Sequence, residues 1–146
     1  MDKNLPDKWI RKAIFDAFNG TIVDGKTINV FDSRQSADDI AVNNAYVLMA
    51  SQSNNVNETK SGDYYVSTIR LEVIVFYNST GNPGSRLLAD NIIDELRSAL
   101  NPQISLDLAS GRNVISQNFN FVNDVVTPSV NKSIFRKILD LTFTID

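Results

Sequence analysis

The sequence predicts an α+β fold: an antiparallel or mixed sheet of about five strands with two helices packed on one face. The pattern gives one amphipathic helix, three β segments, a second amphipathic helix and two final β segments, in the order α-β-β-β-α-β-β. Helices that arrive singly between runs of strands favour such a sheet. The 146 residues, 42% of them hydrophobic, suffice for one core. We therefore expect residues 1–146 to form a single domain whose other sheet face is open to a partner.

The composition argues against several classes of function. The net charge is −3 and the isoelectric point is about 4.9, whereas a groove that follows a nucleic-acid backbone needs clustered Lys and Arg. The absence of Cys and His removes the thiolate nucleophile, cysteine-ligated metal sites and the usual general base. We therefore expect neither enzymatic activity nor a cofactor.

The segment Met1 to Pro6 lacks the basic start and apolar run of a signal peptide. No stretch of the sequence approaches the length of a transmembrane helix. We expect a soluble protein that is made in the cytoplasm and has no membrane partner.

The first helix is predicted to begin at Pro6, which suits a first helical turn, and to end at Asn19-Gly20. Its apolar residues recur at helical spacing and form one stripe. They are Trp9, Ile10, Ala13, Ile14, Ala17 and Phe18. This stripe indicates a half-buried core helix.

A short hairpin is predicted next, because Asp24-Gly25 separates the β segments 21–23 and 27–31 and accepts the positive φ of a tight turn. The polar stretch that follows, 32–39, has no periodicity and is typical of an exposed loop. Its acidic pair Asp38 and Asp39 suggests either solvated charge or acid/base chemistry, and solvated charge is favoured because a loop fixes no relative geometry.

Residues 45–50 form a nearly continuous apolar run, as expected of a central strand covered on both sides. The polar stretch Ser51 to Asp63 contains almost nothing that can pack, so it is expected to be a mobile arm outside the sheet. Two interpretations stay open for it, a binding segment or a plain connection.

Clean alternation predicts a long strand from Tyr64 to Tyr77, with Thr68, Arg70 and Glu72 on its polar, half-exposed face. Ser85 can cap a second helix that ends before Asn101-Pro102. The buried stripe of this helix comprises Leu88, Ala89, Ile92, Leu96, Ala99 and Leu100.

Two β segments complete the chain, Asn113 to Thr127 and Ser133 to Asp146, with Pro128 between them. The second one alternates clearly. If it pairs with the Tyr64 to Tyr77 strand, Arg70 and Glu72 meet Arg136 and Asp140 on a shared polar surface. We expect this face to meet solvent or a neighbouring subunit.

The arrangement resembles the tail-completion or tail-terminator family of tailed bacteriophages and related neck (head-tail connector) ring proteins. The resemblance lies in the helix containing Trp9 to Ile14, the strand Ala45 to Met49 after an acidic loop, the long strand Tyr64 to Tyr77 and the helix Ser85 to Leu100. The chain departs from the pattern in its Asn-rich loops and in the extended segment Gln103 to Thr127, which leaves its position in the neck open.

The resemblance implies a structural virion protein of the phage neck or tail, assembled in the host cytoplasm. Its partners would be copies of itself in a ring, a hexamer or dodecamer, together with tail-tube, portal or other neck proteins, and DNA would at most pass through the lumen. Such a ring terminates the tail tube or joins tail to head. Ring closure needs no catalytic group, because it repeats a modest contact around an axis.

On this hypothesis, the candidate contact segments are 51–63 and 32–44. The candidate interface residues are Asp38, Asp39, Asn54, Asn55, Glu58, Lys60, Arg70, Glu72 and Arg136. An alternative is a monomeric adaptor or inhibitor that binds one protein through the exposed sheet face or edge. A third hypothesis, a carboxylate-only hydrolase using Asp38, Asp39, Asp90 and Asp94, is disfavoured, because these residues fall on separate surfaces.

Overall fold

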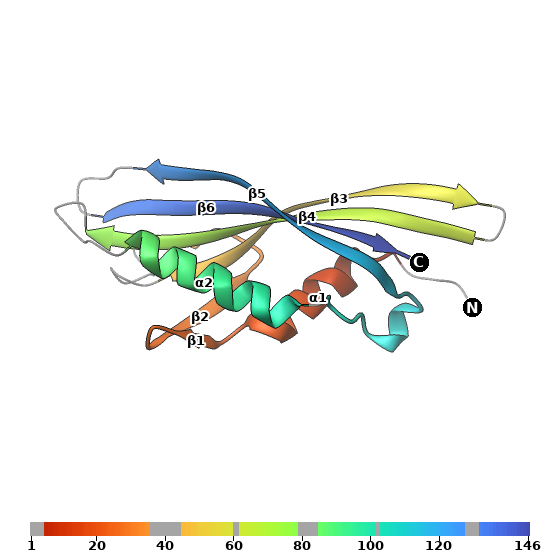
Figure 1. Cartoon of the computed structure of the whole chain (residues 1–146), viewed down its shortest axis with the longest axis horizontal. Helices are drawn as coiled ribbons and strands as arrows, with labels where there is room; N and C mark the ends of the chain where they lie inside the picture. Colours follow the sequence, from red (N-terminus) through yellow and green to blue (C-terminus); the bar gives the residue numbers. More distant parts are fainter. Residues whose placement is uncertain (1–4, 36–44, 60–61, 79–84, 102, 128–131) are drawn as a thin grey trace.

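The computed structural model describes residues 5–35, 45–59, 62–78, 85–101, 103–127 and 132–146. Its strands form one mixed sheet in the order β1-β2-β3-β4-β6-β5, and both helices lie on the same side of that sheet (Figure 1). The elements are α1 (Asp7–Phe18), β1 (Thr21–Val23), β2 (Lys26–Phe31), β3 (Ala45–Thr59), β4 (Gly62–Asn78), α2 (Ser85–Leu100), the 3₁₀ turn η1 (Leu108–Ser110), β5 (Val114–Thr127) and β6 (Lys132–Ile145). The predicted α+β class and the mixed sheet are confirmed.

The expected arm after residue 50 is instead part of the sheet. Strand β3 continues to Thr59 and pairs with β4 up to the register Thr59↔Gly62. The described residues form six strands, where about five were expected, because the two strands of the hairpin 21–31 count separately. Ser and Asn have a low intrinsic preference for strands, but β4 provides a continuous row of backbone partners that outweighs it.

The strand directions explain why the sheet is mixed. Strands β2 and β3 are parallel, with Asn29 opposite Tyr46, while the other neighbouring pairs are antiparallel. The predicted hairpin is confirmed: β1 and β2 are joined through Asp24 (φ 51°) and Gly25 (φ 76°). Two consecutive positive φ angles are the signature of a type I′ turn, whose twist matches that of the strands.

The main core lies between the sheet and the two helices. Ile10, Ile14 and Phe18 of α1 are fully buried, while α2 contributes the buried residues Leu88, Ala89, Ile92, Ile93, Leu96 and Leu100. The outer members of the predicted α1 stripe lie at the margin of the core, because Trp9 is half-buried and Ala17 is exposed.

A second apolar cluster lies on the opposite, helix-free face. It contains Tyr46, Leu48, Ile74 and Phe76, with Phe31 and Ile134 packed against it. The Tyr46 ring stacks on Phe76 at a centroid distance of 6.1 Å and meets Phe31 edge-on at 5.6 Å. The prediction that the run at 45–50 is covered on both sides is thereby confirmed for Tyr46 and Leu48.

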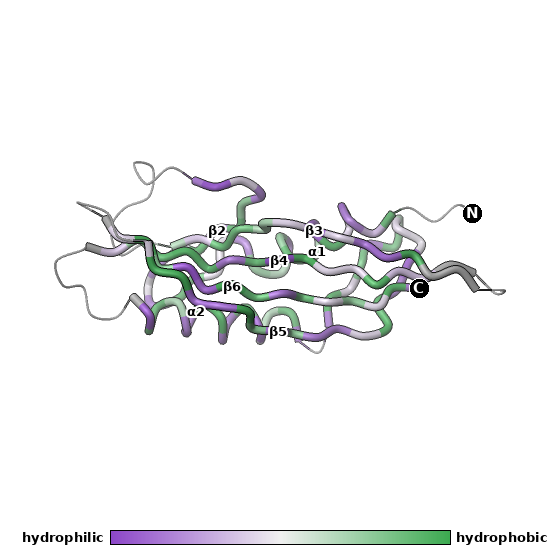
Figure 2. The backbone as a smooth tube through the Cα atoms, turned by 90° about the horizontal axis from the view of Figure 1, so that it is seen from above, coloured by the Kyte–Doolittle hydropathy of each residue, from purple (hydrophilic) through white to green (hydrophobic). Residues whose placement is uncertain are grey.

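The two halves of β3 differ in character. Viewed from above, β3 passes from apolar beside β2 to polar along its second half (Figure 2). Only Tyr46, Val47 and Leu48 pair with β2, so the polar half lies beyond the end of β2. The fold therefore leaves the second half of β3 at a boundary of the sheet.

Candidate interaction surfaces

A buried carboxylate occupies the centre of the helix-free face. Glu72 is 2% exposed and accepts hydrogen bonds from Nε of Arg136 at 2.7 Å and from Nη2 of Arg34 at 3.1 Å. The expectation that Glu72 lies on an exposed strand face is wrong, because the two guanidinium groups cover it. A carboxylate removed from water requires such paired, hydrogen-bonded cations.

Arg70 and Asp140 form a second ion pair on this face. Nε of Arg70 donates to Oδ1 of Asp140 at 2.9 Å, and Nη2 donates to Oδ2 at 3.2 Å. These hydrogen bonds, and then the charge of Asp140, raise the pKa of the Arg70 guanidinium. The predicted meeting of Arg70 and Glu72 with Arg136 and Asp140 is confirmed by the β4–β6 register.

On the side of the pair away from Glu72, this face carries uncharged polar groups. Thr68 and Thr142 are 3.2 Å apart through their hydroxyl oxygens. Ser53 lies opposite Thr68 on β3, and Asn118 and Asn120 of β5 lie opposite Thr142 and Asp140. Since opposite residues share a face, hydroxyl and amide groups adjoin the Arg70–Asp140 pair on that side.

The remaining predicted interface residues lie in different places. Asn54 is half-buried on the helix side, where it hydrogen-bonds the carboxylate of Asp7 and accepts from the hydroxyl of Ser67. Asn55 is exposed, and the backbone of Glu58 belongs to β3. Asp38, Asp39 and Lys60 lie outside the described residues. The assignment of these residues to an interface stays a prediction.

Strand β5 forms one edge of the sheet, a feature that the sequence interpretation did not single out. It is 14 residues long and carries one charged residue, Asp124. Its exposed apolar residues are Ile115, Phe121, Val122 and Val126, each between 44% and 59% exposed. The signal in the sequence was a β segment without Lys, Arg or Pro, the residues that usually protect an edge strand.

A groove runs along the opposite side, between α1 and the outer side of β3. Two adjoining hollows of about 490 and 270 Å³ share Asp32 and Met49. Phe15 and Phe31 line the larger, more apolar hollow, and Arg11 lines the smaller one. The groove therefore has an apolar end near β2 and a polar end along the second half of β3.

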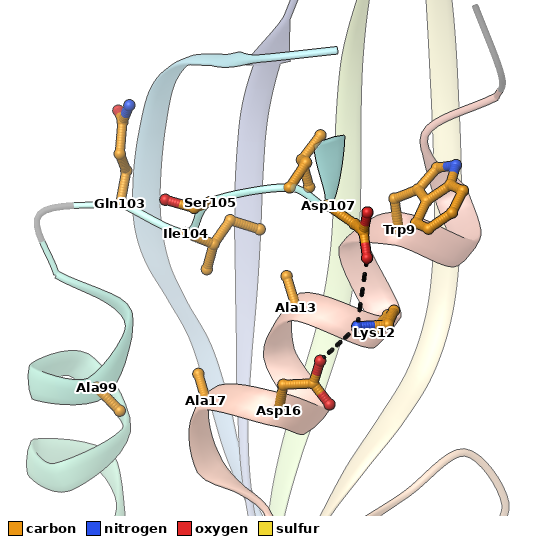
Figure 3. A pocket seen from close by; sticks show the side chains of 11 residues that line it. Trp9, Lys12, Ala13, Asp16, Ala17, Ala99, Gln103, Ile104, Ser105 and Asp107 are labelled. Carbon is orange, nitrogen blue, oxygen red and sulfur yellow. Dashed lines mark hydrogen bonds and ion pairs between the residues drawn. The ribbon is translucent and has the colours of Figure 1, made fainter. Parts of the chain in front are cut away.

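A separate pocket of about 440 Å³ lies where α1 meets the segment 103–107 (Figure 3). Lys12 bridges Asp16 at 2.7 Å and Asp107 at 3.7 Å. The hydrogen bond with Asp16 is the main cause that raises the pKa of Lys12. The pocket is open because Ala13 and Ala17 have small side chains. Its polar groups are held in ion pairs, and none of the described lining residues is an activated nucleophile.

The carboxylates considered for hydrolysis do not assemble in the described part of the chain. Asp90 pairs with Lys137 at 2.7 Å across the α2–β6 contact, and Asp38 and Asp39 fall outside the described residues. Within the described ranges, no group of three or more acidic residues is placed to hold a metal ion. None of the helices described combines the length and apolar character needed to cross a bilayer.

No protein-family model matches the chain, and no curated protein matches it. Among solved structures, a chain of the structure titled "Virion of native gene transfer agent (GTA) particle" aligns with 94% of this chain and 96% of its own length. The TM-score is 0.60 and the sequence identity is 12%. This protein therefore shares its whole-chain fold with a chain of a gene transfer agent virion.

Proposed function

We propose that this protein is a structural virion component that forms a homo-oligomeric ring in the neck or tail region of a tailed phage. There it terminates the tail tube, joins tail to head, or does both. The observation that carries the proposal is the similarity along nearly the full length of both chains to a component of a gene transfer agent virion. The proposed ring size, a hexamer or dodecamer, and the proposed tail-tube, portal or neck partners come from the resemblance of the sequence pattern.

The physical character of the molecule supports this proposal. A connector needs a rigid module that repeats one contact around an axis, and the long strands β3, β4 and β6 provide such a module. The polar part of the helix-free face, where Arg70 pairs with Asp140 and Thr68 lies beside Thr142, suits a surface that meets solvent or passing DNA without holding it.

The test is the native mass of the purified chain over a concentration series, with negative-stain microscopy of any large species. A closed ring, sixfold or twelvefold, supports the proposal. If the chain stays monomeric at every concentration, and also when purified tail tubes are added, the ring hypothesis is wrong.

A second candidate is a monomeric adaptor or inhibitor that binds one protein partner. The exposed edge of β5 favours it, because an edge strand can accept an extended segment of another protein by adding a strand to the sheet. This alternative predicts a one-to-one complex and no ring, so the same mass measurement separates the two.

A further inference from the structure

The sheet has a long free edge on each side. In the order β1-β2-β3-β4-β6-β5, strand β5 is outermost on one side. On the other side, β2 pairs only with Tyr46 to Leu48, and the described part of the chain places no other strand along Ser51 to Thr59. Unpaired backbone donors and acceptors on such edges bind a further strand readily.

The directions of the two edges are compatible. Strand β3 is antiparallel to β4, β4 to β6 and β6 to β5, so β5 runs opposite to β3. In a ring whose axis lies roughly along the strands, rotation preserves strand direction. The β5 edge of one copy therefore meets the β3 edge of the next copy in antiparallel orientation, which permits a regular ladder.

The side chains along the two edges complement each other. Phe121 and Val126 lie opposite Leu139 and Phe135, which belong to the core beneath the helices, so they lie on the helix side of the sheet. The groove beside β3 lies on the same side, because Met49 in its wall belongs to that core. Phe121 is level with Leu139, Leu71 and Met49 across the sheet, so rotation about an axis along the strands brings it level with Met49 in the groove of the next copy.

Charge favours one of two ways of pairing copies. Asp124, the one charged residue of β5, belongs to none of the ion pairs formed among the described residues. A two-fold contact between β5 strands would place a second β5 strand beside it, and that strand offers no cation to this carboxylate.

The β3 side, in contrast, carries Arg11, whose Nη1 donates to Gln52 at 2.6 Å, and Lys8 one turn earlier, with Asp32 where the two hollows of the groove join. A head-to-tail contact therefore offers Asp124 a surface that carries cations. Exposed charges of this kind select the partner more than they add affinity.

We propose that neighbouring copies join head to tail, with the β5 edge of one copy pairing with the Ser51–Val56 edge of the next and Phe121 entering the groove beside Phe15 and Met49. This inference rests on the proposed ring and identifies the contact between neighbouring copies that would close the ring. A heterologous contact of this kind generates a ring when its rotation closes. It also removes both free edges of the sheet.

Disulfide trapping tests the contact directly, because the chain contains no cysteine. Asn120→Cys on β5 is mixed in turn with three β3 variants, Ser51→Cys, Ser53→Cys and Asn55→Cys. All four positions lie on the helix-free side of the sheet. Because the β3 positions are two residues apart, the mixtures test different alignments of β5 against β3 on the same face. Mild oxidation should give a cross-linked dimer for one mixture, and none for Asn120→Cys alone. As a control, Asn120→Cys is mixed with Ser105→Cys, an exposed position between α2 and η1, and this mixture should give no cross-linked dimer.

A second measurement uses the apolar contact. Phe121→Lys should weaken assembly at least about tenfold, while Leu87→Lys, a similarly exposed apolar residue on α2, should leave it unchanged. Rings that form normally with Phe121→Lys, or that yield no mixed cross-link, overturn the β5–β3 contact while the ring proposal survives. Cross-linking of Asn120→Cys with itself indicates the two-fold contact instead. A chain that never assembles overturns both proposals.

Discussion

Arg70 on β4 and Asp140 on β6 lie directly opposite each other, and two parallel hydrogen bonds of 2.9 and 3.2 Å join their side chains on the helix-free face. Their side chains are 41% and 20% exposed, so water still screens the pair. The pair therefore matches the register of the two long strands but adds little to their stability.

The first prediction concerns this pair. In a double-mutant cycle with Arg70→Met and Asp140→Leu, we expect a coupling free energy close to the error of the measurement, because both side chains retain contact with water. Urea unfolding of the four proteins measures it. Raising the salt concentration should reduce the coupling further, and a coupling as large as that of a buried ion pair would mean that the pair is shielded from solvent.

The second prediction ranks the two cations around Glu72. Arg136→Met should lower the free energy of unfolding by about 2–4 kcal/mol, because it leaves the buried carboxylate with only the more exposed Arg34. Arg34→Met should cost about 1 kcal/mol or less, since its side chain is 56% exposed.

The double variant Glu72→Leu with Arg136→Met serves as the control for this ranking. It removes both buried charges next to the apolar cluster around Leu48, so it should regain most of the stability lost by Arg136→Met alone. Equal losses for Arg136→Met and Arg34→Met would contradict the unequal burial of the two guanidinium groups.

The third prediction tests whether the helix-free face has a true core of its own. Phe76→Ala should destabilise the protein by about 3–5 kcal/mol, as much as Phe143→Ala in the main core, because both rings are at most 1% exposed. Thermal unfolding of the two variants compares them. A loss below about 1 kcal/mol for Phe76→Ala would show that its ring has access to water in solution.

The fourth prediction separates folding from assembly in the β3–β4 hairpin. Replacing residues 57–64 by Asn-Gly joins Val56 to Tyr65, a pair already in register, through a dipeptide suited to a tight turn. Because Asn54 and its bonds to Asp7 and Ser67 are kept, the melting temperature should change little. Loss of ring formation in native mass measurements would support the hairpin as a contact segment, and full assembly would remove it from the interface.

Local pattern was sufficient for several elements. The second helix begins at Ser85 and ends at Leu100 as predicted, since its apolar spacing and the following Asn101-Pro102 act within a few residues of each other. Asp24-Gly25 likewise defined the first hairpin. Even the β4–β6 contact of Arg70 with Asp140 followed from two alternating strands with complementary charges.

Other features could not be obtained from local pattern. Ser51 to Thr59 lacks strand-forming residues, and its strand conformation depends on pairing with β4. Glu72 occupies a polar position in an alternating strand, and it is buried because Arg34, 38 residues away, and Arg136, 64 residues away, both reach it. The parallel alignment of β2 with β3 is also a contact between separate segments.

The sequence by itself determined the α+β class, both helices, the first hairpin and the absence of cysteine and histidine chemistry, because each depends on residue type or on spacing along one segment. Only the tertiary structure decided which strands became edges. It placed Phe121 and Val122 on one free edge and the groove lined by Phe15 and Phe31 beside the other. Whether a strand is central or at an edge depends on which segments pair on both of its sides, a long-range property that no single stretch of sequence encodes.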